Sequence, residues 1–238
     1  MDIPVRKMLV NPNKYGIKCP FDLDWEYVTI HNTYNDASAH NEIQYMINNT
    51  KEVSFHDAVD DIEIVTGIPH NRNAWAAGDG AKGKGNRKSL HIEICYSKSG
   101  GERYKKAEAN TIKYTAQLLK ERGFGIDRVK KHEDWSGKHC PHRILDEGRW
   151  RKFLNSINEE LVKLNTPKKT IHFLTGGYAG SSLAEIHSYI TTNNWWFNPA
   201  KNADGSITFT VGGFGEGTKA AVEFEDYLKE HNWWYEIR

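Results

Sequence analysis

Helical spacing of apolar residues is clearest between residues 149 and 164. There, an apolar stripe recurs at positions i, i+3, i+4, i+7 and i+11, which is the period of one helix face. The stripe consists of Trp150, Phe153, Leu154, Ile157 and Leu161. Residues 39–49 also predict a helix, as does a longer segment that carries Ile112 to Leu119 and stops at Gly123.

Short apolar runs between these helices predict β-strands. Residues 26–31 and 128–132 each predict a strand that ends in a histidine, and residues 89–96 predict a buried strand. Residues 52–61 and 63–69 have the pattern of a hairpin. Strands interspersed with helices favour an α/β fold over residues 1–165, with a mixed central β-sheet flanked by helices.

An internal repeat occupies residues 170–238, after a polar segment, 166–169, that we interpret as a linker. Each copy predicts a strand, a Gly-Gly-aromatic turn, an amphipathic helix and a strand that carries Trp-Trp-aromatic. Two βαβ units predict a small α+β domain with a ferredoxin-like layout. The tryptophan pairs are expected in its core, although alternation along a strand leaves room for one exposed ring in each pair.

Composition excludes several classes of protein. Lys and Arg number 32 against 31 Asp and Glu, which gives no reason to propose a nucleic-acid partner. No apolar run approaches the roughly 18–20 residues of a membrane span. The first residues lack the apolar core of a secretion signal, so we expect synthesis in a cytoplasm. Three dispersed cysteines in such a chain argue against a disulfide framework.

Three candidate metal ligands stand at predicted strand ends or just beyond them: His31, His132 and Cys140. Two imidazoles and a thiolate are a common zinc set, and three protein ligands leave a fourth position free for chemistry. Spacing alone does not choose between His132 and its neighbours His139 and His142. Cys140 lies in a polar loop where burial for its own sake is not expected, whereas Cys95, inside an apolar strand, is expected to be a buried small residue.

Two further residues carry predicted chemistry. Alternation along residues 89–96 places His91, Glu93 and Cys95 on one face of the strand. A buried carboxylate is costly unless it is paired, so we expect Glu93 to face a pocket, where it is able to accept a proton. Lys138 lies two residues from Cys140 and is placed to stabilise an oxyanion.

The glycine-rich stretch at residues 78–89 is not a phosphate-binding loop. Gly85 stands where Ser or Thr must hold magnesium, and the stretch precedes a predicted strand rather than opening a helix. We expect a flexible loop beside the substrate.

Five segments together resemble the zinc-dependent N-acetylmuramoyl-L-alanine amidases of the type 2 family, which share a fold with the peptidoglycan recognition proteins. They are "TIHNT", "VSFHDAVDD", "NAWAAGDG", "GNRKSLHIEIC" and "HEDWSGKHCPHR", in the same order along residues 1–165. The resemblance is strongest to endolysins of Bacillus phages and prophages. It implies hydrolysis of the amide bond between N-acetylmuramic acid and L-alanine in bacterial peptidoglycan.

The resemblance also implies roles for individual residues. One Zn²⁺ per chain would be held by His31, His132 and Cys140, which selects His132 over His139 and His142. Glu93 would be the catalytic glutamate, although some relatives have a tyrosine there, and Lys138 would stabilise the transition state. The same segments hold the expected substrate contacts, which are His56, Trp75, Asn86 and Trp135.

The ending "HNWWYEIR" resembles the C-terminal cell-wall-binding domain of such endolysins, and the layout of the repeat is similar to that of sporulation-related repeats that bind peptidoglycan. This resemblance implies that residues 170–238 bind a wall polymer of Gram-positive bacteria. We therefore expect a monomer, made in the host cytoplasm, with no membrane or nucleic-acid partner. The alternative is a non-catalytic peptidoglycan-binding receptor of the same fold; such receptors commonly lack the cysteine. A glycosidase is a further alternative that only product chemistry excludes.

Overall fold

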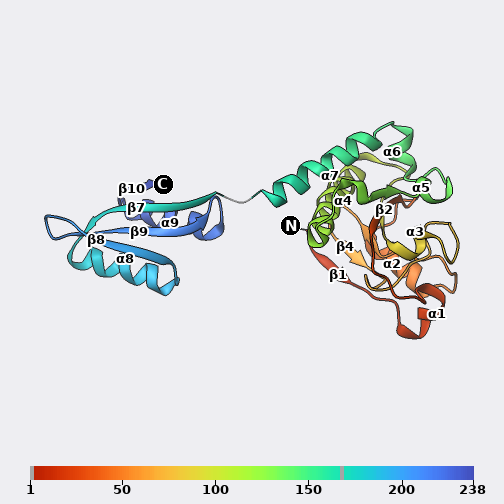
Figure 1. Ribbon diagram of the computed structural model, residues 1–238, viewed down its shortest axis with the longest axis horizontal. Helices are drawn as coiled ribbons and strands as arrows, with labels where there is room; N and C mark the ends of the chain where they lie inside the picture. The colour runs from red at the N-terminus through yellow and green to blue at the C-terminus, as the bar shows by residue number, and fades with distance from the viewer. Residues whose placement is uncertain (1–2, 167–168) are drawn as a thin grey trace. The chain divides into compact units, whose positions relative to one another are not determined.

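The computed structural model describes residues 3–166 and 169–238, so residues 167 and 168 of the predicted linker lie outside the described residues (Figure 1). The chain divides into two compact units, residues 1–165 and 166–238. Each unit has its own hydrophobic core. Within the described residues, no helix is long and apolar enough to cross a membrane.

The first unit is built on a six-stranded sheet with the order β1-β4-β3-β5-β2-β6. Its strands are β1 (Val5–Lys7), β2 (Tyr27–Asn32), β3 (Asp57–Val59), β4 (Ile64–Thr66), β5 (Ser89–Ile94) and β6 (Val129–Lys131). Strands β3 and β4 pair antiparallel, as the predicted hairpin requires, and the other neighbours pair parallel. The predicted mixed sheet is confirmed.

Helices and 3₁₀ turns connect these strands (Figure 1). They are η1 (Pro12–Lys14), α1 (Tyr15–Lys18), α2 (Ala39–Asn48), α3 (Lys84–Lys88), α4 (Gly101–Arg122), η2 (Ile126–Arg128), α5 (Glu133–Ser136), α6 (His142–Asp146) and α7 (Trp150–Asn165). Helix α4 ends at Gly123, which adopts the left-handed conformation (φ 65°) that favours glycine at a helix end. Helix α7 buries Phe153, Ile157 and Leu161, three members of its predicted apolar stripe.

The two faces of the sheet differ in the helices that cover them. On one face the Tyr114 hydroxyl of α4 donates to Asp57 Oδ2 of β3 at 3.2 Å. Asp57 is in register with Ile92, so Glu93, the next residue of β5, points to the opposite face. Helix α2 contacts β3 and β4. The negative charge of its Glu42 raises the pKa of Glu93.

The glycine-rich stretch differs from the prediction. Part of it forms the short helix α3, and Gly85 and Asn86 within α3 are buried. Asp79 accounts for this order, because its carboxylate accepts hydrogen bonds from the Gly85 and Asn86 backbone N–H groups at 2.6 and 3.2 Å. A carboxylate at the start of a helix satisfies amides that have no partner within the helix.

The second unit has the element order β7 (Thr170–Tyr178), α8 (Gly180–Thr192), β8 (Trp196–Lys201), β9 (Ile207–Gly215), α9 (Lys219–Glu230) and β10 (Tyr235–Ile237). Its four strands lie in the order β10-β7-β9-β8, with every pair antiparallel. The predicted β-α-β-β-α-β layout is confirmed. The Gly-Gly pairs, however, lie inside β7 and β9 and do not form turns. Gly213, with φ 79°, is the extra residue of a β-bulge.

The tryptophan pairs of the second unit divide between core and surface. Trp195 and Trp233 pack against the core that α8 and α9 form with the sheet. Trp196 and Trp234 are 57% and 60% exposed. Successive residues of an extended chain point to opposite sides, so each pair contributes one ring to each side.

Candidate metal centre and active site

Three adjacent parallel strands bring the candidate residues together. In the register of β2 with β5, His31 is opposite Glu93. In the register of β2 with β6, Ile30 is opposite Lys131, so His132 follows beside His31. Because parallel strands end at the same edge of a sheet, residues far apart in the sequence meet there.

His31, His132 and Cys140 form a compact cluster, with their ligand atoms within 4.8 Å of one another. His31 Nδ1 lies 3.0 Å from His132 Nδ1 and 3.8 Å from Cys140 Sγ. Tetrahedral zinc would place two nitrogens about 3.3 Å apart, and nitrogen and sulfur about 3.6 Å apart. The donor set and its spacing therefore suit one metal ion.

The two other histidines of this segment point elsewhere. His139 is exposed and lies 2.7 Å from Asp146 Oδ1. The His142 ring packs against Tyr34, with ring centres 4.4 Å apart. The structure therefore brings His132, and neither neighbour, into the cluster.

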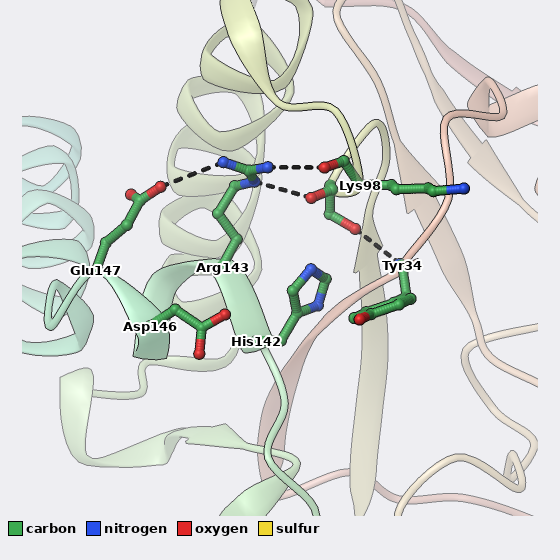
Figure 2. A pocket seen from close by; sticks show the side chains of 7 residues that line it. Tyr34, Lys98, His142, Arg143, Asp146 and Glu147 are labelled. Carbon is green, nitrogen blue, oxygen red and sulfur yellow. Dashed lines mark hydrogen bonds and ion pairs between the residues drawn. The ribbon is translucent and has the colours of Figure 1, made fainter.

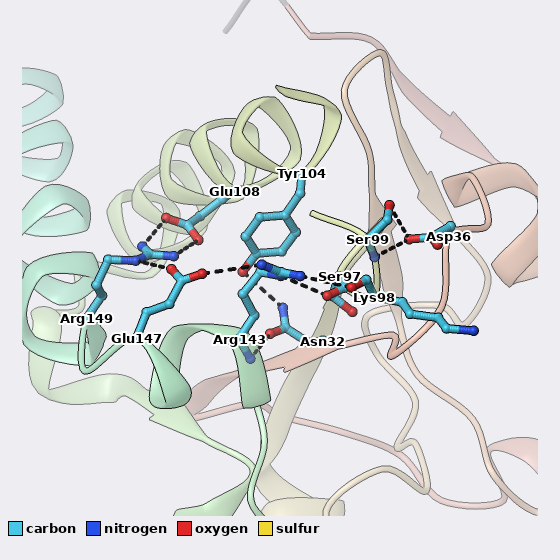
Figure 3. Close-up of polar contacts among 10 residues, drawn as sticks. All are labelled: Asn32, Asp36, Ser97, Lys98, Ser99, Tyr104, Glu108, Arg143, Glu147 and Arg149. Atoms are coloured by element: carbon cyan, nitrogen blue, oxygen red, sulfur yellow. Dashed lines mark hydrogen bonds and ion pairs between the residues drawn. The ribbon is translucent and has the colours of Figure 1, made fainter. Parts of the chain in front are cut away.

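A polar network anchors the segment that carries Cys140 (Figure 3). The Arg143 backbone N–H donates to Asn32 Oδ1 at 3.1 Å, just beyond His31. The Arg143 guanidinium donates to the carbonyls of Ser97 and Lys98 at 2.8 and 2.9 Å, beyond the end of β5. These bonds hold the start of α6, and with it Cys140, against the ends of β2 and β5.

Burial shifts the pKa values of all three cluster residues towards their uncharged forms. Burial lowers the pKa of His132 to about 4 and holds the pKa of His31 well below its usual 6.5. Burial and the negative charge of Glu93 raise the pKa of Cys140 to about 12. A bound cation reverses the last effect, because a coordinating thiol is deprotonated.

Among the residues that the structure describes, the carboxyl group of Glu93 has no ion-pair partner. Burial, followed by the negative charge of Glu42, raises its pKa to about 8, against a smaller opposing effect of Lys138. Its Oε2 atom is buried without a hydrogen-bond partner in the described structure. A carboxyl group in this state is suited to exchanging protons near neutral pH.

The cluster and Glu93 open into a pocket of about 290 Å³. Its apolar wall contains Val53, Phe55, Trp75 and Ala76, and Lys138 is exposed at its edge. Its remaining lining comprises His31, Asn32, Gly78, Glu93, His132, Ser136 and Cys140.

Of the four expected substrate contacts, only Trp75 lines this pocket. His56 is fully buried, with Nε2 2.9 Å from the Arg72 carbonyl. Asn86 Oδ1 accepts from the Ala76 and Ala77 N–H groups. Trp135 Nε1 donates to Thr29 Oγ1 at 2.8 Å. These polar atoms are bonded inside the protein, so the structure shows no free polar group of His56, Asn86 or Trp135 at this pocket, and their contact with substrate stays a prediction.

A second pocket of about 290 Å³ lies beyond the ends of β2 and β5 (Figure 2). Figure 2 shows the His142 ring between Tyr34 and Asp146. Tyr34 is 70% exposed and Lys98 is exposed beside it. Asn32, which sequence reasoning missed, lines the first pocket and bonds to Arg143 of the second. Alternation along residues 89–96 predicts the face on which His91 lies but no role for it.

Three side chains that are able to bind a metal ion, beside a largely buried carboxyl group in an open pocket of an α/β fold, define a candidate metal-dependent hydrolase. Comparison with known proteins makes the class specific. Residues 21–143 match the N-acetylmuramoyl-L-alanine amidase family. The chain belongs to this family, so the family and enzyme class predicted from the sequence are confirmed.

Curated relatives and solved structures agree with this membership. The chain is 58% identical over 193 residues to the N-acetylmuramoyl-L-alanine amidase CwlA of Bacillus subtilis (strain 168), covering 81% of this chain and 67% of the relative. It is 64% identical over 187 residues to the amidase XlyB of the same organism, covering 79% of this chain and 57% of the relative. The chain thus spans about three fifths to two thirds of the length of these relatives.

The structure of PlyL is similar to this chain with a TM-score of 0.64 and 56% identity, covering 66% of this chain and 98% of PlyL. The PlyG catalytic domain gives a TM-score of 0.64 and 53% identity, covering 69% of this chain and 99% of that domain.

Proposed function

We propose that this chain is a phage-type endolysin whose first unit, residues 1–165, hydrolyses the amide bond between N-acetylmuramic acid and L-alanine in peptidoglycan. The observation that carries the proposal is the convergence of His31, His132 and Cys140 beside Glu93. Membership of the amidase family supplies the bond that is cut.

We assign one Zn²⁺ to His31, His132 and Cys140, because two imidazoles and one thiolate are typical zinc ligands. A zinc ion held there supplies Lewis acidity, which lowers the pKa of water from about 16 towards about 7. Three protein ligands leave one position open, as catalytic sites require and structural sites do not.

The residues around the cluster have separate roles in this proposal. Glu93 accepts the proton of the attacking water and returns it to the leaving amine of L-alanine. The Lys138 ammonium stabilises the negative charge that develops on the carbonyl oxygen. Trp75 and Phe55 form the apolar wall against which the substrate packs.

The test uses the purified full chain and isolated Bacillus cell walls, with chelator and after zinc is restored. Products are assayed for new amino groups of L-alanine and for reducing sugars. Amino groups that vanish with chelator and return with zinc support the proposal. Reducing sugars without amines would indicate a glycosidase, and binding without product would indicate a receptor.

We propose that the second unit, residues 170–238, binds a polymer of the Gram-positive wall. The side of its sheet away from α8 and α9 carries the exposed Trp196 and Trp234. In register across this side lie Trp196, Gly212 and His172, and the rings of His172 and Trp196 meet edge to face at 5.8 Å. Because Gly212 has no side chain, the exposed aromatic rings beside it leave a flat surface on which a polymer is able to lie.

The substitutions Trp196→Ala and Trp234→Ala test this surface. Both rings are exposed, so we expect weaker sedimentation with cell walls and an unchanged melting temperature. Tyr45→Ala in α2 is the matched control, because Tyr45 is 62% exposed in the first unit. Equal wall binding by all three variants would refute the assignment. A monomeric state and synthesis in the host cytoplasm stay predictions.

A further inference from the structure

A buried chain of hydrogen bonds runs behind the cluster, from His31 to the short helix α3. His31 Nε2 lies 3.0 Å from His91 Nδ1. His91 Nε2 in turn lies 3.0 Å from the Gly85 carbonyl oxygen. His91 is fully buried, so both of its ring nitrogens are used inside the protein.

The chemistry of these partners fixes which nitrogen atoms carry protons. A carbonyl oxygen only accepts, so His91 Nε2 must be the N–H that donates to Gly85. A hydrogen bond between two ring nitrogens needs one bare acceptor. With its donor proton on Nε2, His91 offers Nδ1 as that acceptor, and His31 Nε2 is the N–H that donates. With its ring proton on Nε2, His31 has a bare Nδ1, as a metal ligand requires. That atom faces His132 Nδ1 and Cys140 Sγ.

We propose that His91 is a positioning residue for the metal centre: it holds His31 in the tautomer and ring orientation that present Nδ1 to a cation. The inference rests on the metal site assigned above and goes beyond it. Metal-ligating histidines generally donate their second N–H to an oxygen acceptor. Here a second histidine lies between the ligand and the carbonyl.

The Gly85 carbonyl is itself held in place. The Gly85 N–H donates to Asp79 Oδ2 at 2.6 Å. A Cβ atom at Gly85 would lie 2.4 Å from Ala77 Cβ and 2.8 Å from the Trp135 ring, so only glycine fits. The glycine-rich stretch thus anchors the hydrogen bonds of His91 at the end away from His31.

His56 fixes the other side of His91. The two rings stack with centres 5.7 Å apart and planes 14° apart. His56 Nδ1 accepts from the His91 backbone N–H at 2.9 Å. His56 packs beside one side of the ring and both ring nitrogens are bonded, so these contacts together hold His91 in place against His31.

Zinc affinity tests the proposal without reference to catalysis. The full chain is titrated with Zn²⁺ against a chromophoric chelator for the wild type, His91→Phe and His91→Asn. The phenylalanine keeps the ring but removes both bonds, so we expect zinc affinity to fall about 10- to 100-fold. The asparagine keeps an oxygen acceptor near the position of Nδ1, so its affinity should lie between those of the other two.

His187→Phe is the matched control, because it makes the same substitution at an exposed histidine of the second unit, away from these hydrogen bonds. It should bind zinc as the wild type does. Equal affinity of the wild type and a folded His91→Phe variant would overturn the inference alone. Failure of the wild type to bind zinc would overturn the metal site as well.

A second measurement needs no variant. In the zinc-free wild type, long-range ¹H–¹⁵N spectra should show His31 and His91 both protonated at Nε2 and bare at Nδ1. A proton on His31 Nδ1, or a mixture of His31 tautomers, would overturn the inference even if His91→Phe did not fold.

Discussion

Glu93→Gln should remove activity and stabilise the metal-free protein at neutral pH. The substitution keeps the shape of the side chain but cannot accept a proton. The pKa of Glu93 is raised by burial from 4.5 to about 8, so at pH 7 the folded protein holds a proton that the unfolded chain releases. Stability therefore falls as pH rises between these two values, because the folded state binds more protons there.

The size of the effect follows from the same shift. From 4.5 to pH 7, each pH unit costs the folded state about 1.4 kcal/mol, which gives about 3 kcal/mol in total. Glutamine carries no such cost. In a unit of this size, 1 kcal/mol moves the melting temperature by about 2–4 °C, so Glu93→Gln should raise it by about 6–12 °C at pH 7.

The assay is thermal unfolding with chelator present, at pH 7 and at pH 4.5, because a bound cation would lower the pKa of Glu93. The melting temperature of Glu93→Gln should exceed that of the wild type by a large margin at pH 7 and hardly at all at pH 4.5. Glu159→Gln, at an exposed position of α7, is the control for the change in charge. With zinc restored, Glu93→Gln should keep stoichiometric metal and lose about 10²- to 10⁴-fold in kcat. A melting temperature equal to that of the wild type at pH 7 would refute the reasoning.

Three further predictions concern the metal, the second unit and a buried ion pair. Cys140→Ser should lower zinc affinity by more than about 100-fold and abolish activity; stoichiometric zinc after dialysis would exclude Cys140 as a ligand. Deletion of residues 170–238 should reduce lysis of whole cells by at least about tenfold, through the loss of effective concentration, and should spare hydrolysis of small muropeptides. Burial lowers the pKa of His70, but the negative charge of Asp57 outweighs it and raises that pKa above 6.5. The ion pair therefore stabilises the folded protein fully below pH 6.5, and this stabilisation is lost as pH rises through the raised pKa. The difference in melting temperature between the wild type and His70→Phe should therefore be largest below pH 6.5 and narrow above it; a constant difference would contradict this.

The local sequence pattern was sufficient to predict the helices and strands and part of the candidate site. Alternation along residues 89–96 places His91 and Glu93 on one face, and the structure agrees. The repeat in residues 170–238 predicted the layout of the second unit, because each copy is a short unit with its own apolar period. Both features depend on contacts between residues near in sequence.

The sequence pattern did not predict which side chains line the pocket beside Glu93. His56, Asn86 and Trp135 lie in the segments that resemble the amidases, yet their polar atoms are bonded within the protein. A polar residue beside a catalytic segment either contacts substrate or supports the residues that do. Only the direction of its side chain in the folded chain distinguishes the two.

The sequence by itself determined strands β2 and β6, whose ends lie beside His31 and His132, the carboxylate inside β5 and the two-unit plan, because these follow from local periodicity. Spacing left His132, His139 and His142 open and the resemblance implied His132; the tertiary structure shows why, because it alone brings His132 beside His31 and Cys140. His31 and His132 are 101 residues apart and meet only because β2 and β6 are neighbours in the sheet. His91 acts on His31 because β5 is the neighbour on the other side. Strand order is a long-range property, and a metal site needs atoms within a few ångströms, so only the fold brings the candidate ligands together.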